Sequence, residues 1–118
     1  MAEPNFILLY VADTGVSVDF YTRLMGKGPI EQAATFAMFA LSSGVMLGLW
    51  QRDGVLPPAT APGGGELAFA VGDVDGTHAE WAQQGITILQ SPTNMDFGRT
   101  FLAADPDQHR LRVFAPPG

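Results

Sequence analysis

The sequence contains no cysteine, few basic residues and no long apolar run. The absence of cysteine excludes a disulfide scaffold, a thiol nucleophile and a thiolate metal site. The six basic residues are scattered and are outnumbered by twelve acidic ones, which argues against a nucleic-acid partner. No stretch reaches the roughly 18 uninterrupted apolar residues that a membrane span needs. The net charge of −6 is most simply explained by solubility.

The start of the chain also lacks a targeting pattern. An acid stands where a signal peptide would carry its basic region, and the apolar run that follows is short and alternates. Together with the missing cysteines, this predicts a cytoplasmic protein. At 118 residues the chain is long enough for a single domain, 1–118, with one hydrophobic core.

The first half of the chain reads as one helix among several strands. Residues 5–11 are predicted to form a strand buried on both faces, and residues 16–25 a helix. A short strand is expected around Ile30. Two further strands, 36–41 and 45–50, are joined by a tight Ser-Ser-Gly turn, which is typical of a hairpin.

A Gly/Pro-rich linker, 54–65, separates this half from a second run of the same kind. A strand at 66–71, a helix at 75–84 and a strand at 86–89 lead into a final hairpin. This hairpin joins strands 100–103 and 110–114.

The hairpin turn is Asp105-Pro106-Asp107-Gln108. Proline presets φ there, and the aspartates can accept bonds from nearby backbone amides. Alternation along the strand after the turn places Arg110 and Arg112 on one face.

The two halves are internally related. A shift of 60 residues places Val11 on Val71 and Asp13 on Asp73. Each half reads βαβββ, with modules at 5–53 and 66–115. We therefore expect an α+β fold in which two such modules pack edge to edge, so that their mixed sheets curl round a shared cavity.

Short motifs stand at the element boundaries: Leu9-x-Val11-x-Asp13, Ser43-Gly44, Phe69-Ala70-Val71-Gly72-Asp73 and Asp105-Pro106-Asp107. In this order they resemble the vicinal oxygen chelate superfamily, which holds glyoxalase I, extradiol dioxygenases and bleomycin-binding resistance proteins. The resemblance covers nearly the whole chain and implies a cupped mixed β-sheet built from two βαβββ modules. It also implies a homodimer, which in some members is domain-swapped, and a linker such as 54–65 would serve that exchange.

The resemblance also implies where a metal would be bound. At the strand positions where the family's metal enzymes carry ligands, this chain has Phe6, Gly48, Glu66 and Arg112. Only Glu66 can bind a divalent ion, and a usable site needs three or four ligands. We therefore expect no metal, no cofactor and no catalytic residue. Glu66 and Arg112 are predicted to form an ion pair, either inside the cavity or solvated at its rim.

Strand alternation gives the expected cavity face. Flat aromatic side chains, small residues and a few polar groups suit a planar aromatic guest. Trp50 is favoured as a ligand wall and Phe6 as an ordinary core residue. Arg99 could gate the cavity mouth or anchor its own loop, and anchoring is favoured. The predicted ligand-binding residues are Phe6, Tyr10, Phe39, Met46, Gly48, Trp50, Glu66, Arg99, Phe101, Arg112 and Phe114.

A closer resemblance is to the family's small metal-free proteins that bind phenazine-type antibiotics. This resemblance rests on Gly48-Leu49-Trp50, the stretch 97–102, His109 after the turn, and Arg112-Val113. It implies antibiotic resistance by sequestration of the drug between aromatic rings. Gln108 departs from the glycine usual at that turn position.

Two other functions stay open at this point. One is a metal-dependent lyase or oxidoreductase of the glyoxalase or dioxygenase type, which needs metal ligands that the sequence does not provide. The other is a regulatory or structural module with a vestigial pocket.

Overall fold

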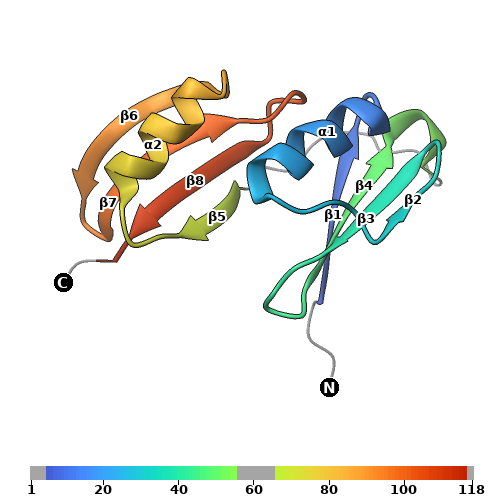
Figure 1. Cartoon of the computed structure of the whole chain (residues 1–118), viewed down its shortest axis with the longest axis horizontal. Coiled ribbons are helices and arrows are strands. Elements are labelled where there is room, and N and C mark those ends of the chain that lie inside the picture. The colour runs from blue at the N-terminus through green and yellow to red at the C-terminus, as the bar shows by residue number, and fades with distance from the viewer. Residues whose placement is uncertain (1–4, 56–65, 117–118) are drawn as a thin grey trace. The chain divides into compact units, whose positions relative to one another are not determined.

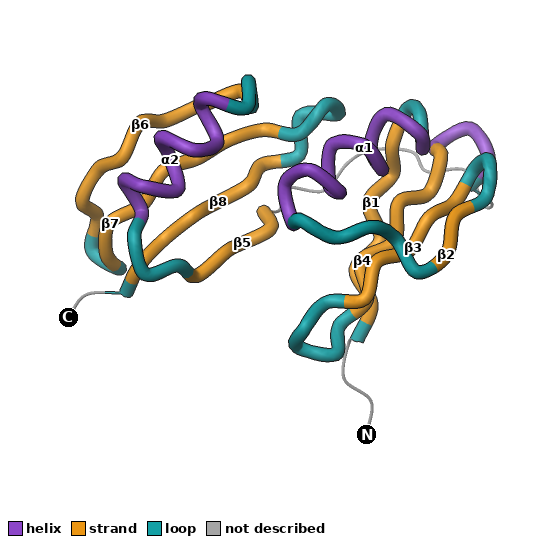
Figure 2. Tube along the Cα trace, viewed as in Figure 1, coloured by secondary structure: helices purple, strands orange, loops and turns teal. Residues whose placement is uncertain are grey.

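The computed structural model describes residues 5–55 and 66–116. The chain divides into two compact units, Met1–Pro62 and Gly63–Gly118. Each unit is one helix against one four-stranded sheet, as Figures 1 and 2 show. The predicted α+β fold of two βαβββ modules is therefore confirmed, whereas a cavity shared between the modules stays a prediction. No helix among the described residues is long and apolar enough to cross a membrane.

The first module begins with a strand and its helix and ends with a single 3-10 turn. Its sheet has the strand order β1-β4-β3-β2. β1 runs parallel to β4, and the other neighbours are antiparallel. The elements are β1 (Phe6–Val11), α1 (Thr14–Met25), β2 (Glu31–Gln32), β3 (Phe36–Ala40), β4 (Met46–Gln51) and η1 (Arg52–Gly54).

The second module repeats this topology. Its sheet has the order β5-β8-β7-β6, again with one parallel pair, β5 and β8. The register repeats as well, because Tyr10 pairs with Trp50 in one module and Ala70 with Phe114 in the other. The elements are β5 (Glu66–Ala70), α2 (Val74–Gln83), β6 (Thr87–Met95), β7 (Gly98–Ala104) and β8 (Arg110–Ala115).

The repeated aspartates are helix caps. The Asp13 carboxylate accepts a hydrogen bond from the Val16 amide at 3.2 Å, and Asp73 accepts one from the Gly76 amide at 2.9 Å. Each bond satisfies one of the backbone donors that the first turn of a helix leaves unpaired. The sequence repeat thus marks two equivalent helix starts.

Each module has its own core between the helix and one face of the sheet. In the first module the fully buried side chains include Tyr21, Phe39 and Leu49. In the second they include Phe101 and Leu111. Within each module, the helix covers one face of the sheet, and the opposite face, to which alternate strand residues point, is not covered by that module's own helix (Figure 1).

Several predicted boundaries and burials are corrected. β1 is not buried on both faces, since Phe6 and Tyr10 are each 39% exposed. The short strand lies at Glu31–Gln32, just after Ile30. β6 extends to Met95 through a stretch predicted as loop, with register shifts along its pairing with β7. Most of the predicted linker lies outside the described residues.

The DPD turn forms as predicted. The Gln108 amide donates to the Asp105 carbonyl at 3.0 Å, which closes the turn. The buried Asp105 carboxylate accepts bonds from the Asp107 and His109 amides at 2.9 and 2.8 Å. Its second oxygen lies 2.7 Å from Nδ1 of the His109 ring. The turn is therefore fixed by one buried side chain.

Candidate functional site

The helix-free face of the first sheet carries an apolar concavity. It is lined by Phe6, Leu8, Phe36 and Trp50 and has a volume of about 400 Å³. These side chains come from β1, β3 and β4, which are neighbours in the sheet. Three of the four are aromatic, so the wall consists mainly of flat π-faces.

Trp50 occupies a defined place in this wall. Its ring meets that of Tyr10, its partner on β1, edge to face with 6.4 Å between centroids. Phe36 is its partner on β3. Trp50 is half-buried. Trp50 therefore lines the concavity of the first module, and ligand contact by Trp50 stays a prediction.

Gly48 leaves no empty space on this face of the sheet. A Cβ atom at this position would lie 2.6 Å from Cδ2 of Leu8 and 2.7 Å from Cε1 of Phe6. The ring of Phe36 would be 3.3 Å away. The three side chains therefore close over the glycine and form the floor of the concavity. Met46 is half-buried on the same face.

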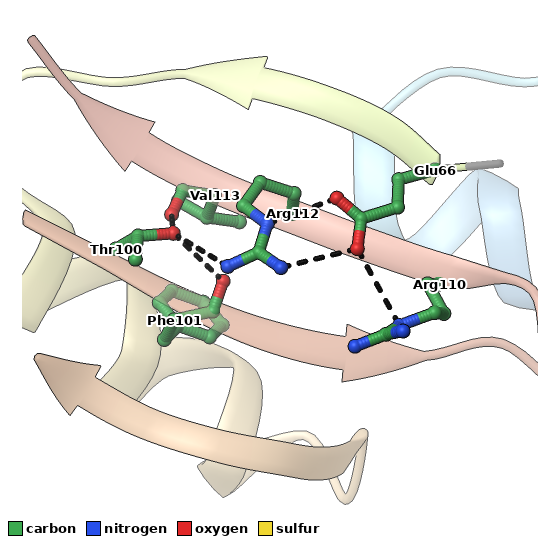
Figure 3. Close-up of polar contacts among 6 residues, drawn as sticks. All are labelled: Glu66, Thr100, Phe101, Arg110, Arg112 and Val113. Carbon is green, nitrogen blue, oxygen red and sulfur yellow. Dashed lines mark hydrogen bonds and ion pairs between the residues drawn. The ribbon is translucent and has the colours of Figure 1, made fainter. Parts of the chain in front are cut away.

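The helix-free face of the second sheet carries an ion-pair cluster (Figure 3). Nε of Arg112 donates to Oε1 of Glu66 at 3.0 Å, and Nη2 donates to Oε2 at 3.1 Å. Nε of Arg110 lies 3.4 Å from Oε2 of the same carboxylate. The predicted pair of Glu66 and Arg112 is confirmed, and Arg110 joins it as a third member. The pKa of Glu66 is lowered by the hydrogen bonds from Arg112 and by the charges of both arginines.

Arg112 is held on its other side by a buried threonine. Nη1 of Arg112 donates to the Thr100 hydroxyl at 3.3 Å. That hydroxyl in turn donates to the Val113 carbonyl at 2.8 Å. The Arg112 side chain is only 17% exposed, and these contacts fix the orientation of its guanidinium (Figure 3).

An aromatic pair stands beside this cluster. The rings of Phe97 and Phe114 meet edge to face, with 6.3 Å between centroids. Cζ of Arg112 lies 5.9 Å from the Phe97 centroid, within cation–π range. Phe114 was predicted on this face, but Phe97 was not. Phe97 lies in the β6–β7 turn, where strand alternation gives no direction for a side chain.

Three predicted ligand-binding residues lie on the helix side of their sheets. Phe39 is fully buried in the core of the first module. Phe101 is fully buried beneath α2, with its ring centroid 5.4 Å from that of Trp81. These two predictions are wrong, because both side chains are core residues that no guest on the open face can reach.

Arg99 is the third of these residues. Its Nε and Nη2 donate to the Asp75 carboxylate at 2.9 and 2.8 Å, and its Nη1 donates to Asn94 at 3.0 Å. The hydrogen bonds from Arg99 lower the pKa of Asp75, and the pKa of Arg99 is raised. Arg99 thus ties β7 to the first turn of α2 and to β6. This is the favoured anchoring role, made through side chains and not backbone carbonyls.

The residues at the family's metal-ligand positions do not fit a divalent ion. Phe6 and Gly48 have no donor atom, and a guanidinium cannot lose its proton to become a ligand. Both carboxylate oxygens of Glu66 are taken by Arg112 and Arg110. Over residues 5–55 and 66–116, no three His, Asp or Glu side chains gather in a way that could hold a metal ion.

Comparison with known proteins identifies the family. The model of the Glyoxalase/Bleomycin resistance protein/Dioxygenase superfamily matches residues 4–113. The chain belongs to this superfamily. The phenazine antibiotic resistance protein EhpR of Enterobacter agglomerans is 34% identical over 116 residues, which cover 93% of this chain and 89% of EhpR.

Two solved structures share the fold of this chain. The protein ATC0852 of Agrobacterium tumefaciens is 50% identical, with a TM-score of 0.89 and coverage of 100% of both chains. A glyoxalase-related enzyme from Fulvimarina pelagi has a TM-score of 0.86 at 21% identity, covering 99% of this chain and 90% of that one. At that identity the second likeness shows the fold alone. The predicted resemblance to the superfamily, and to its phenazine-resistance members, is thus confirmed.

Proposed function

We propose that this chain is a metal-free binding protein that sequesters a planar aromatic molecule, such as a phenazine-type antibiotic. The observation that carries the proposal is the concavity of about 400 Å³ lined by Phe6, Leu8, Phe36 and Trp50. Small-molecule sites are typically concave and mostly apolar, with volumes of about 300–1,000 Å³. The similarity to EhpR supports the choice of guest. Sequestration needs no catalytic residue, and we assign none.

The guest would stack on the indole of Trp50. Tyr10 supports that indole from the side, at 6.4 Å between centroids, so the ring is braced before the guest arrives. A braced aromatic wall loses little side-chain entropy on binding, which favours affinity. Phe6 and Leu8 would form the floor beneath the guest.

Stacking alone does not account for tight binding. Burying about 200 Å² of aromatic surface at about 25 cal/mol per Å² contributes about 5 kcal/mol. A micromolar dissociation constant corresponds to about 8 kcal/mol, and association entropy must be offset as well. Polar contacts must supply the difference.

The test is a tryptophan-fluorescence titration with phenazines and other planar aromatics, run in EDTA and corrected for inner-filter absorption. The chain has two tryptophans, and the second, Trp81, is buried beside Phe101 in the other module. We expect saturable quenching at micromolar concentration or below. Trp50→Phe should abolish it, while the remaining signal of Trp81 serves as an internal reference. By calorimetry, Trp50→Ala should weaken binding at least tenfold.

Two results overturn the proposal. One is a flat titration with every compound in the panel. The other is quenching that persists unchanged in Trp50→Phe, since Trp81 would then carry it. Binding that EDTA abolishes, with one tightly held divalent ion per chain, would instead favour the metal-dependent lyase or oxidoreductase.

A further inference from the structure

The floor of the apolar concavity covers a glycine in an interior strand of the first module. Gly48 stands in β4, which has β1 on one side and β3 on the other. Glycine weakens the interior of a strand, because it has no side chain to pack and loses more backbone freedom on folding than any other residue. A glycine in such a place often marks the close approach of another group.

Three side chains converge on Gly48 from the two neighbouring strands. Leu8 is its direct partner on β1, and Phe6 and Phe36 lie diagonally opposite it on β1 and β3. A Cβ atom on Gly48 would lie 2.6 Å from Cδ2 of Leu8 and 2.7 Å from Cε1 of Phe6. Carbon atoms in van der Waals contact are about 3.5–4.0 Å apart. The space above Gly48 is therefore already filled by side chains that line the concavity.

An added Cβ atom would raise the floor of the concavity and leave the core beneath the sheet alone. The clashing atoms are the ends of two exposed side chains, Phe6 and Leu8, so they can move at little cost. Because the sheet lies beneath them, they can move only outward, into the space that they line. Trp50 does not supply any of the three atoms nearest to that Cβ atom, so its place in the wall is kept.

We propose that Gly48 determines the size of the guest, by giving the concavity the depth for three fused aromatic rings. This inference rests on the proposed function, because it adds the size of that guest. Without a Cβ atom on Gly48, Phe6 and Leu8 lie low and leave a concavity of about 400 Å³. A guest of three rings buries more apolar surface there than a guest of two rings, and therefore binds more tightly. Gly48 acts through its neighbours and is a positioning residue.

The experiment compares two neutral planar guests that differ by one ring. Phenazine has three fused rings, and quinoxaline is the same diazine without one benzo ring. Both affinities are measured by quenching of Trp50 fluorescence, and their ratio is the preference for phenazine. We expect the wild-type chain to bind phenazine about tenfold more tightly than quinoxaline. In Gly48→Ala the phenazine affinity should fall about tenfold and the quinoxaline affinity about twofold, which reduces the preference to about twofold.

A matched control separates this effect from a general effect of alanine. Gly54→Ala adds a Cβ atom in the same module where no atom lies within 4 Å, and it should leave both affinities unchanged. Gly48 does not have a positive φ, so alanine can adopt its backbone conformation. We therefore expect Gly48→Ala to remain folded, with a urea midpoint close to that of the wild-type chain.

A second pair of variants keeps the test valid if Gly48→Ala does not fold. Leu8→Ala removes the atom nearest to the added Cβ atom and leaves Phe6 as the group that the Cβ atom displaces. The double variant Leu8→Ala/Gly48→Ala should then show a smaller preference for phenazine than Leu8→Ala alone. An equal preference in these two variants would contradict the inference.

The outcomes distinguish this inference from the function on which it rests. If Gly48→Ala keeps the wild-type preference, or lowers both affinities by the same factor, Gly48 does not set the size of the guest while aromatic binding stands. A wild-type chain that binds quinoxaline as tightly as phenazine has the same meaning. If neither compound nor any other planar aromatic binds the wild-type chain, the proposed function fails first and this inference fails with it.

Discussion

At the scale of the residue, Gln108 is in an unfavourable backbone conformation. Its φ is 69°, the left-handed region, and it is the sole non-glycine residue with positive φ in the described ranges 5–55 and 66–116. A residue with a Cβ atom pays roughly 1–2 kcal/mol for this conformation. A glycine at this position, which lacks the Cβ atom, would avoid that cost.

Gln108→Gly should therefore stabilise the chain. The relief of strain exceeds the roughly 0.5–1 kcal/mol that glycine loses through its greater freedom in the unfolded state. We expect a net gain of about 0.5–1 kcal/mol, measured as a higher urea midpoint with an unchanged slope. Gln108→Ala is the matched control and should give no such gain, because alanine keeps the Cβ atom. A lower midpoint for the glycine variant would contradict this account.

Residue positions were predictable where the sequence carries a local chemical signal. Asp13 and Asp73 stop a strand and can cap a helix, and both do so. Phe39 was misplaced because aromatic residues stand on both faces of β3, Phe36 on one and Phe39 on the other. The pairing of Phe36 with Trp50 across the sheet, which is a non-local contact, decides which one lies on the open face.

At the scale of the element, the Glu66 ion pair fastens the edge strand β5 to its neighbour β8. Opposed charges on adjacent strands stabilise pairing by modest amounts. Glu66 is about one-third exposed, so solvent screening limits the contribution of the pair to about 0.5–1 kcal/mol.

The stability of the pair should depend on pH in a defined direction. Folding lowers the pKa of Glu66 from its ordinary 4.5, chiefly through the hydrogen bonds from Arg112. The stabilisation is therefore complete above about pH 4.5 and is lost as pH falls through the lower pKa of the folded state. We expect Glu66→Gln to reduce the free energy of unfolding at pH 7 and to differ less from wild type at an acidic pH below 4.5, as measured by urea unfolding.

The matched control for this measurement is Glu31→Gln, which removes an exposed carboxylate on β2. Its difference from wild type should be small at both pH values. A Glu66→Gln difference that grows as the pH is lowered would have the wrong sign and would contradict the assignment.

Helices and paired strands were predictable as elements because periodicity, caps and turn residues agree. The length of β6, in contrast, could not be predicted from the sequence. Pro92 and the polar residues around it are typical of a loop, yet they lie within this strand. β6 is an edge strand with register shifts, where a missing backbone donor costs little. Edge position depends on strand order, which local sequence does not encode.

At the scale of the whole molecule, the edge strand β1 of the first sheet carries several large apolar side chains that are exposed. The exposed side chains on β1 include Phe6, Leu8 and Tyr10. Contiguous apolar patches of this kind mark interaction or binding sites. A guest in the concavity and a second subunit are two ways to cover such a surface.

We propose that the chain is a homodimer, as the family resemblance implies. Sedimentation equilibrium at micromolar concentration should give twice the 12.6 kDa mass of one chain. Leu8→Glu, which places a charge on the exposed apolar face, should lower the mass toward that of a single chain because burying an unpaired charge is costly. Glu31→Gln should leave the mass unchanged. A wild-type mass of one chain across the concentration range would overturn the dimer, and the open face would then be covered by a guest alone.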